Sequence, residues 1–426
     1  MIYPWGYDPY YTLPKVVYLD IFVLATWLYI ILKRKYRTLN LTKSYLKAEF
    51  IILLFLSLIV ISTMFSVDLK TSLYGTKNRY AGALSIFCYC SVFLFSYRFM
   101  DSKKLEKIIP GMAIVSIPVS IYGILQHYSL DFLPRNSGKM GELRSYSFFD
   151  NPNFFGSYLV LILLLTITLY INANSKKMVT FYFSILCIAF VALIFSGTRS
   201  GWVGVFCGML FLTVFVILKR KFLWKKWAII VLTFGFIFFT LNMIEKGNFL
   251  NRISSGVTDS YNIVTDQSTG MEGSSRLYIW KKALPLVKTY FWIGSGPDTF
   301  AKVFPYNQEE YLKYFGDPNV TVDKAHNVYL QMAITVGVPA LIVYFSIIVF
   351  VLRQAFRAIK QAVGKEKIYI YGLVSTILGY LVQAFFNISV VPVAPLFRAV
   401  LGITLAKSSV YLKSKSSNTE NFNQSA

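Results

Sequence analysis

Charged residues, histidines and cysteines are all scarce in this sequence. Only 15% of the 426 residues are charged, and 43 basic side chains outnumber 20 acidic ones. With two histidines, the chain has very few side chains that exchange a proton near neutral pH. The four cysteines all lie in apolar stretches, so no disulfide framework is implied, and small buried side chains are the better interpretation.

Long apolar runs are what the sequence has in abundance. Apolar residues make up 55% of the chain. They gather in runs of about 17–25 residues, which can cross roughly 30 Å of hydrocarbon as helices. We therefore predict an all-α polytopic membrane protein, a single integral membrane domain over residues 1–426 with eleven or twelve transmembrane helices. The approximate spans are 16–32, 48–66, 81–97, 108–126, 153–171, 179–196, 201–218, 227–244, 327–352, 368–388 and 393–411.

The net charge of +23 is distributed in a way that argues against nucleic acid as a partner. Alternate short loops between the spans are basic, and the loops between them are far less so. The basic clusters lie at 33–47, 98–107, 176–177, 219–226 and 353–367. This is the pattern of the positive-inside rule. The basic residues would then orient the helices and contact anionic membrane lipids.

This orientation divides the chain between the two sides of the membrane. It predicts that the amino terminus lies outside and the carboxyl terminus in the cytoplasm. A large, partly helical loop, residues 245–326, is then extracytoplasmic. The tail 413–426 is rich in serine and asparagine, and we expect it to be disordered in the cytoplasm.

Three arginines on the predicted outer side lack an obvious structural role. Arg144 precedes a helix start that does not account for it. Arg199 stands in a tight turn between two apolar spans, where it either snorkels to the headgroups or faces an anion. Arg276 falls in the first turn of a helix that Ser274 or Ser275 could cap, where a positive charge opposes the helix dipole. A bound phosphate would explain Arg276, and an ordinary interfacial arginine is the alternative.

His326 stands where the polar loop meets the next apolar span. A neutral imidazole there can accept a proton near neutral pH, which makes it a candidate general base. The alternative is a histidine that caps a transmembrane helix, but two arginines on the same side of the membrane favour function. Farther along, Gly337-Val338-Pro339 falls inside the predicted span 327–352 and predicts a kink.

Four motifs follow one another along the outer side: Arg199-Ser200-Gly201, Ser275-Arg276-x-x-x-Trp280, Gly294-Ser295-Gly296-Pro297-Asp298-Thr299-Phe300 and His326-Asn327-x-Tyr329-Leu330. In these motifs, their order and their spacing, residues of about 140–350 resemble the O-antigen ligase and Wzy-type polysaccharide polymerase superfamily. Members of that superfamily often have twelve helices with the amino terminus inside, so the eleven spans here depart from the pattern.

The resemblance implies a GT-C-like enzyme whose active site faces outward from the bacterial cytoplasmic membrane. Such enzymes move a glycan from a polyprenyl (undecaprenyl) diphosphate carrier to a sugar hydroxyl of a glycan or lipid-glycan acceptor. The resemblance implies no metal and no cofactor, and other polysaccharide assembly proteins are further candidate partners. It assigns catalysis to His326, as the base, with Arg276 and Arg199. It assigns substrate binding to Arg144, Arg199, Arg276, Asn327 and Tyr329.

These residue types suit that chemistry. A lipid diphosphate gains charge as the glycosidic bond breaks, and arginine binds phosphate oxygens while staying charged at any ordinary pH. A sugar hydroxyl must lose its proton as it attacks, which a neutral histidine can accept. Single displacement inverts the anomeric centre, and no pair of close carboxylates indicates a retaining mechanism. The chain also has no Asp-x-Asp pair to suggest a metal. We therefore predict a metal-independent inverting glycosyltransferase.

Several alternatives stay open at this point. The enzyme either polymerises surface polysaccharide, such as capsule or a teichuronic-acid-like polymer, or is an O-antigen ligase proper with a lipid-A core acceptor. The Lys-, Asn-, Ile- and Tyr-rich composition hints at an AT-rich, Gram-positive genome and favours a polymerase. A lipid-linked glycan transporter or flippase is a second class, although its ionisable groups should lie deep within the helices. A membrane scaffold would explain the hydropathy but not the outer arginines and histidine.

Overall fold

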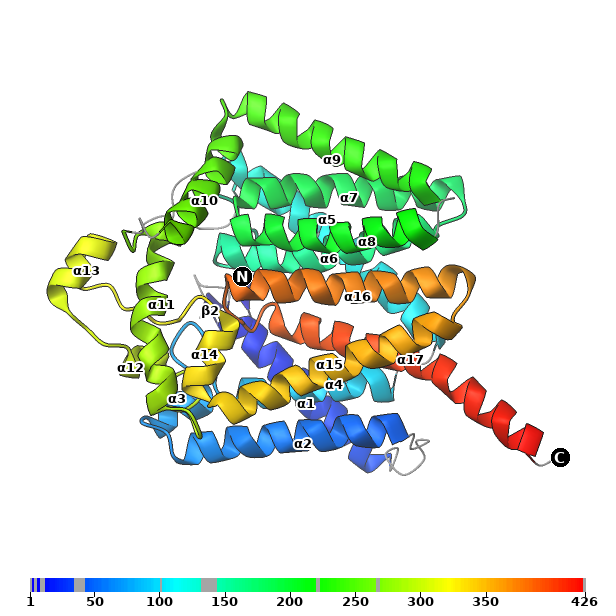
Figure 1. Cartoon of the computed structure of the whole chain (residues 1–426), viewed down its shortest axis with the longest axis horizontal. Coiled ribbons are helices and arrows are strands. Elements are labelled where there is room, and N and C mark those ends of the chain that lie inside the picture. Colours follow the sequence, from blue (N-terminus) through cyan, green and yellow to red (C-terminus); the bar gives the residue numbers. More distant parts are fainter. Residues whose placement is uncertain are drawn as a thin grey trace.

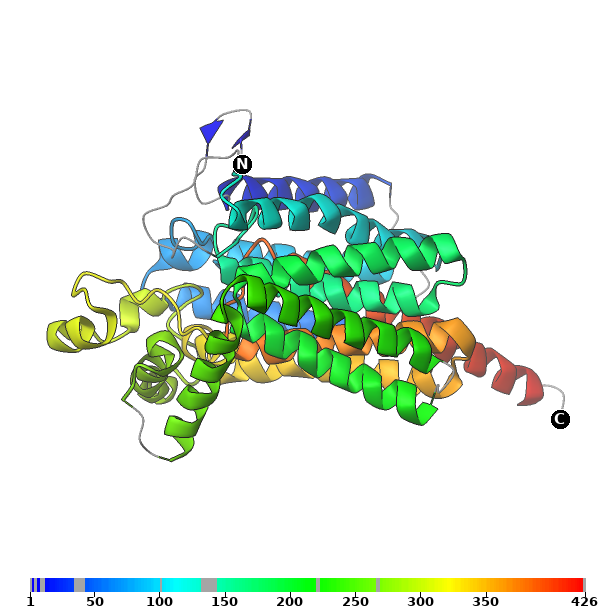
Figure 2. The ribbon, with the colours of Figure 1, turned by 90° about the horizontal axis from the view of Figure 1, so that it is seen from above.

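The protein is almost entirely helical. The computed structural model describes residues 2–3, 6–7, 12–33, 43–99, 102–131, 144–219, 223–265 and 269–423. Two short strands, β1 (Ile2–Tyr3) and β2 (Gly6–Tyr7), pair in antiparallel fashion near the amino terminus. The long helices run roughly side by side in one bundle, as Figures 1 and 2 show from two directions.

Each of the eleven predicted spans falls on a helix of this bundle. The bundle helices are α1 (Leu13–Leu32), α2 (Lys43–Met64), α4 (Ala83–Arg98), α5 (Ser102–His127), α6 (Pro152–Asn172), α7 (Lys176–Ser196), α8 (Arg199–Lys219), α9 (Trp224–Ile244), α15 (Val338–Gln361), α16 (Gly364–Phe385) and α17 (Ala394–Asn423). Within the described residues, nine helices are long and apolar enough to cross a membrane. The shorter apolar helix α4 and the final helix α17 are not among the nine. The prediction of an all-α, multi-pass membrane protein is confirmed.

Helix α6 forms the centre of the bundle. Every residue from Phe154 to Asn172 is buried, as expected of a helix that is apolar on all sides. The helix packs against α5, α7, α8 and α16. Beside it, α8 and α16 approach through two glycines, because a Cβ on either Gly204 or Gly379 would stand 2.7 Å from the carbonyl oxygen of the other. Small residues of this kind let membrane helices pack backbone to backbone.

The span predicted as one kinked helix at 327–352 is two helices, α14 (Val328–Thr335) and α15. Gly337 adopts a φ of 86° between them, and Pro339 lies in the first turn of the second helix. The break frees carbonyl groups at the end of α14. The carbonyl of Thr335 accepts a hydrogen bond from the backbone N–H of Gly296 at 2.8 Å. A surface loop therefore supplies the hydrogen bonds that a continuous helix would have made.

The loop 245–326 forms a helical cap at one end of the bundle (Figure 1). The cap contains α10 (Asn248–Val264), α11 (Glu272–Thr289), α12 (Phe300–Val303) and α13 (Gln308–Phe315), and α3 (Leu69–Tyr74) and α14 lie at the same end. The cap has a hydrophobic core of its own, which includes Tyr278, Ile279, Phe300, Phe304 and Tyr311. The partly helical loop expected from the sequence thus has enough buried surface to hold a fixed shape.

Basic residues lie at the end of the bundle opposite the cap. The loops that join α6 to α7 and α15 to α16 are at that end in Figure 1, next to Lys176, Lys177, Lys360 and Lys365. This separation is the one that the positive-inside rule predicts for an extracytoplasmic cap. Part of the basic cluster at 33–47 lies outside the described residues. Where we expected a disordered tail at 413–426, α17 continues as far as Asn423.

Candidate active site

Two arginines bind the carbonyl end of α7. The helix ends at Ser196, and Gly197 follows in the left-handed conformation with a φ of 57°. The guanidinium of Arg144 donates from Nε to the carbonyl of Ser196 at 2.9 Å, and that of Arg252 donates from Nη2 to the carbonyl of Gly197 at 3.0 Å. The partial negative charge at a helix carboxyl terminus suits such cations. A Cβ on Gly197 would lie 3.2 Å from Nε of Arg144 and 3.3 Å from Nε of Arg252.

Arg199 begins α8, directly after this turn, and reaches across to α10. Its Nη1 donates to Oδ2 of Asp259 and to Oγ of Ser255, both at 3.2 Å. The same oxygen of Asp259 accepts the backbone N–H of Gly273 at 3.1 Å, so one carboxylate links α8, α10 and the start of α11. Arg199 nevertheless keeps 31% of its side chain exposed.

Arg276 follows a strained segment of backbone. Gly273, Ser274 and Ser275 all have φ values near 62–63°, in the left-handed region that favours glycine. The helix cap expected from one of the serines is absent, and the Ser275 hydroxyl donates instead to the carbonyl of Tyr314 at 2.6 Å. This turn places Arg276 where its Nη1 donates to the carbonyl of Phe386, just after α16, at 2.7 Å.

We call Arg144, Arg199, Arg252 and Arg276 the arginine cluster. Burial, followed by the charges of Arg252, Arg276 and Arg199, lowers the pKa of Arg144 to about 10. Burial, followed by the charge of Arg199, also lowers the pKa of Arg276 to about 10. Both side chains stay protonated at neutral pH. Within the described part of the chain, Asp259 is the acid that pairs with the cluster, through Arg199. The cluster therefore holds a large excess of positive charge, which suits a multiply charged anion.

His326 lies two residues before Val328, the first residue of α14, and is not the cap of that helix. The cap is Asn327, whose Oδ1 accepts the backbone N–H groups of Tyr329 and Leu330 at 2.9 and 3.0 Å. The backbone of His326 is left-handed, with a φ of 51°. On its amino-terminal side, the carbonyl of Ala325 accepts the indole N–H of Trp280 from α11 at 2.8 Å. Helix α11 thus anchors the loop that carries the histidine.

The surroundings of His326 keep its imidazole neutral. Burial, followed by the charge of Arg276, lowers its pKa to about 4, against an opposing effect of Asp323. A neutral imidazole can accept a proton at neutral pH. Asp259 links Arg199 to the start of α11, which carries Arg276, and Trp280 links α11 to the loop of His326. The structure therefore brings together, at the cap end, the three residues predicted to take part in catalysis.

The model of the O-antigen ligase family matches residues 183–345. We refer to this matched segment as the O-antigen ligase domain. The predicted superfamily is confirmed, and no curated protein matches the chain. The O-antigen ligase domain includes Arg199, Arg252, Arg276 and His326, whereas Arg144 lies before it. It therefore supplies three of the four arginines and the histidine.

Two predicted substrate-binding residues of the O-antigen ligase domain have partners within the protein. The oxygen of Asn327 caps α14, and the hydroxyl of Tyr329 donates to the carbonyl of Leu381 at 2.7 Å. Their part in substrate binding stays a prediction. Among the described residues, no three histidine, cysteine, aspartate or glutamate side chains come together as metal ligands.

Arg252 is the member of the cluster that sequence reasoning missed. It lies inside the loop 245–326, for which the sequence predicted a partly helical segment and indicated Arg276 but not Arg252. The available signal was periodicity, because Arg252, Ser255 and Asp259 are three and four residues apart and share one face of α10. The opposite face is apolar, which is typical of a helix that lies along a surface.

Proposed function

We propose that this protein transfers a glycan from a polyprenyl diphosphate carrier to a sugar hydroxyl, on the outer face of the bacterial cytoplasmic membrane. The observation that carries the proposal is the arginine cluster beside a neutral His326, of which all but Arg144 lie in the segment that the O-antigen ligase model matches. A dense positive charge with a proton acceptor at its edge suits a diphosphate leaving group and a hydroxyl nucleophile.

The arginine cluster would bind the donor diphosphate. Arg276, whose charge acts on His326, would contact the phosphate next to the sugar, and Arg199 would lie beside it. Arg144 and Arg252, fixed by the carbonyl end of α7, would hold the rest of the diphosphate. Their charge would stabilise the negative charge that develops on the leaving group.

The reaction would be a single displacement. The acceptor hydroxyl loses its proton to the imidazole of His326 as its oxygen attacks the anomeric carbon. The bond from that carbon to the diphosphate oxygen breaks, and its electron pair leaves with the lipid diphosphate, so the anomeric configuration inverts. The proton on His326 is then released to water. No metal ion takes part in this scheme.

Polymerisation and ligation use the same chemistry and differ in the acceptor. A polymerase extends chains that remain on the carrier, whereas a ligase moves finished chains to another acceptor. The sequence composition favours the polymerase. Deleting the gene and sizing the surface polysaccharide separates the two, because single repeat units mark a lost polymerase and full-length chains stranded on the carrier mark a lost ligase.

The roles of His326 and Arg276 are tested in the deletion strain. Complementation with His326→Ala should lower the transfer rate by a factor on the order of 10²–10⁴, the usual contribution of a general base. Arg276→Gln should also abolish surface polymer. The matched control is Lys282→Gln, which removes a cation of the cap that pairs with Glu310 at 2.7 Å. Normal polymer from His326→Ala, in protein present at the wild-type level in the membrane, would disprove the assignment.

A further inference from the structure

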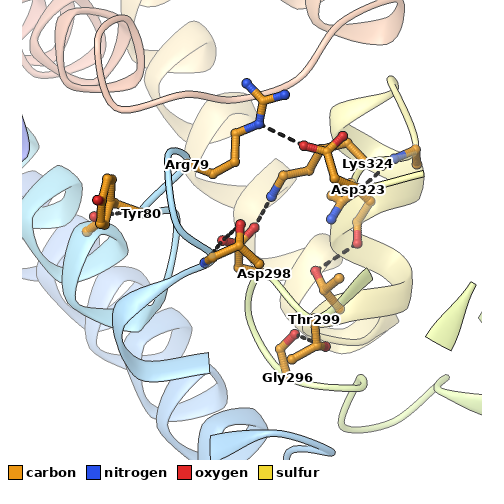
Figure 3. A network of polar contacts seen from close by, with 12 residues as sticks. Arg79, Tyr80, Gly296, Asp298, Thr299, Asp323 and Lys324 are labelled. Carbon is orange, nitrogen blue, oxygen red and sulfur yellow. Dashed lines mark hydrogen bonds and ion pairs between the residues drawn. The ribbon is translucent and has the colours of Figure 1, made fainter. Parts of the chain in front are cut away.

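A second charged group reaches His326 from outside the O-antigen ligase domain. It is Arg79, in the loop 75–82 between α3 and α4, whose Nε donates to Oδ2 of Asp323 at 2.7 Å (Figure 3). Asp323 precedes His326 by three residues. The charges of Arg276 and Arg79 both act to lower the pKa of His326. Arg79 is thus a further cation near His326, and unlike Arg276 it is paired with a carboxylate of the same loop.

The loop that carries Arg79 is held firmly. The backbone N–H and the hydroxyl of Thr76 both donate to Oδ2 of Asp298, at 2.7 and 3.0 Å. The other oxygen of Asp298 pairs with the buried ammonium of Lys324, which is two residues before His326 (Figure 3). A Cβ on Gly75 would lie 2.4 Å from the backbone nitrogen of Ala81, so the loop closes tightly on itself. Its position is thus tied to that of the histidine loop.

The Arg79–Asp323 pair leaves hydrogen-bonding groups open to the outside. The two side chains keep 25% and 30% of their surface exposed. The guanidinium lies 5.5 Å from the ring centre of Phe154, and its Nη atoms point away from Asp323 in Figure 3. Within the part of the chain that the structure describes, neither Nη atom of Arg79 nor Oδ1 of Asp323 makes a hydrogen bond. The pair therefore has N–H donors and a carboxylate acceptor without partners among the described residues, and Asp323 lies three residues before His326.

We propose that Arg79 and Asp323 form the acceptor subsite, where they bind hydroxyls of the acceptor sugar next to the hydroxyl that His326 deprotonates. Each sugar hydroxyl can donate and accept a hydrogen bond, so an adjacent donor and acceptor on the protein suit a pair of them. Asp323 offsets the charge of Arg79, which favours uncharged hydroxyls over a second anion. The inference rests on the proposed function, since it places the acceptor sugar beside the residue proposed as the general base.

The competing explanation is purely structural. The pair could serve only to hold the loop of His326 in its left-handed conformation. A purely structural pair would affect kcat and thus the rate at every acceptor concentration, whereas a binding subsite determines the acceptor concentration at which the rate is half-maximal. The acceptor KM and the choice between acceptors separate the two.

The test uses the purified full-length protein in detergent. The donor is the lipid-linked repeat unit isolated from the deletion strain. The acceptors are a fluorescent oligosaccharide released from the same polysaccharide and its analogue lacking the hydroxyl next to the accepting one. Arg79→Gln and Asp323→Asn should each raise the acceptor KM on the order of tenfold or more, the loss expected for a hydrogen bond to a charged group. Their binding of polyprenyl diphosphate should be unchanged. The wild type should discriminate strongly against the deoxy analogue, and both variants should discriminate less.

The controls distinguish a loss of acceptor binding from a loss of catalysis. Lys282→Gln, which breaks an ion pair of similar exposure elsewhere in the cap, should leave the KM values for the acceptor and for its deoxy analogue unchanged. A lower kcat with unchanged acceptor KM and unchanged discrimination would reject the subsite and show that the pair only holds the His326 loop in place.

Normal transfer by His326→Ala would overturn the proposed function instead. Polyprenyl diphosphate binding also reports folding. If Arg79→Gln fails to fold, Arg79→Lys is decisive. Lysine keeps the charge opposite Asp323 but has one nitrogen in place of the three of the planar guanidinium, and an unchanged acceptor KM there would reject the subsite.

Discussion

The arginines near His326 fall into two groups that differ in charge balance. In the arginine cluster, Asp259 is the one acidic partner within the described residues, and the charges of the other members lower the pKa of Arg144. Arg79, in contrast, is matched by its own carboxylate, Asp323. An unbalanced cluster suits a diphosphate, and a balanced pair suits sugar hydroxyls. The difference implies that the arginines cannot be exchanged for one another.

The largest expected contrast is in donor affinity. Arg252→Gln should weaken the binding of polyprenyl diphosphate by a factor on the order of 10–100, because a charge-assisted contact is lost. It should also reduce the salt dependence of binding. Arg79→Gln, which removes a guanidinium from the Arg79–Asp323 pair, should change neither the affinity nor its salt dependence. Equal losses of affinity in the two variants, measured by titration with the same lipid, would contradict separate roles for the cluster and the pair.

The pH dependence should differ between the free enzyme and the donor complex. In the free protein, burial and Arg276 lower the pKa of His326 to about 4, so the neutral base is fully present at neutral pH and is lost as pH falls through about 4. A bound diphosphate would offset the charge of Arg276 and raise that pKa. The acid limb of kcat should therefore lie at higher pH than that of kcat/KM. Coincident limbs would indicate that no anion binds beside His326.

The smallest effect on function should come from the centre of the bundle. Gly379→Val forces a side chain against the carbonyl of Gly204, 2.7 Å from the new Cβ, and overpacking of this kind costs about 1–3 kcal/mol of stability. The thermal midpoint should fall, while donor and acceptor KM values of the folded protein stay the same. A change in either KM would show that the packing of α8 on α16 also sets the geometry of the site.

Local patterns in the sequence accounted for much of this molecule. The length of the apolar runs predicted the bundle helices. The permanent charge of arginine, placed at a tight turn and at a helix start, indicated Arg199 and Arg276 as functional residues. Gly337 and Pro339 predicted a disturbance in the helix after His326. Each of these features depends on residues that are close together in the chain.

What the sequence did not disclose depends on residues that are far apart in it. Arg79 and Asp323 are separated by 244 positions, so no periodicity or spacing connects them. The serine cap was expected from local preference, and the contact of Ser275 with Tyr314 competes with it. The full break at Gly337 is possible because Ser295 and Gly296 satisfy the carbonyls that it frees, which no local rule could predict.

The helix break at Gly337 also links the cap to the membrane helices. The N–H groups of Ser295 and Gly296 are bonded to the end of α14, and the N–H of Val338 at the start of α15 is bonded to the carbonyl of Phe291. If either partner came away, the other would be left with unsatisfied amides where water is scarce. The cap and helices α14 and α15 should consequently unfold in a single transition, whichever of them is perturbed.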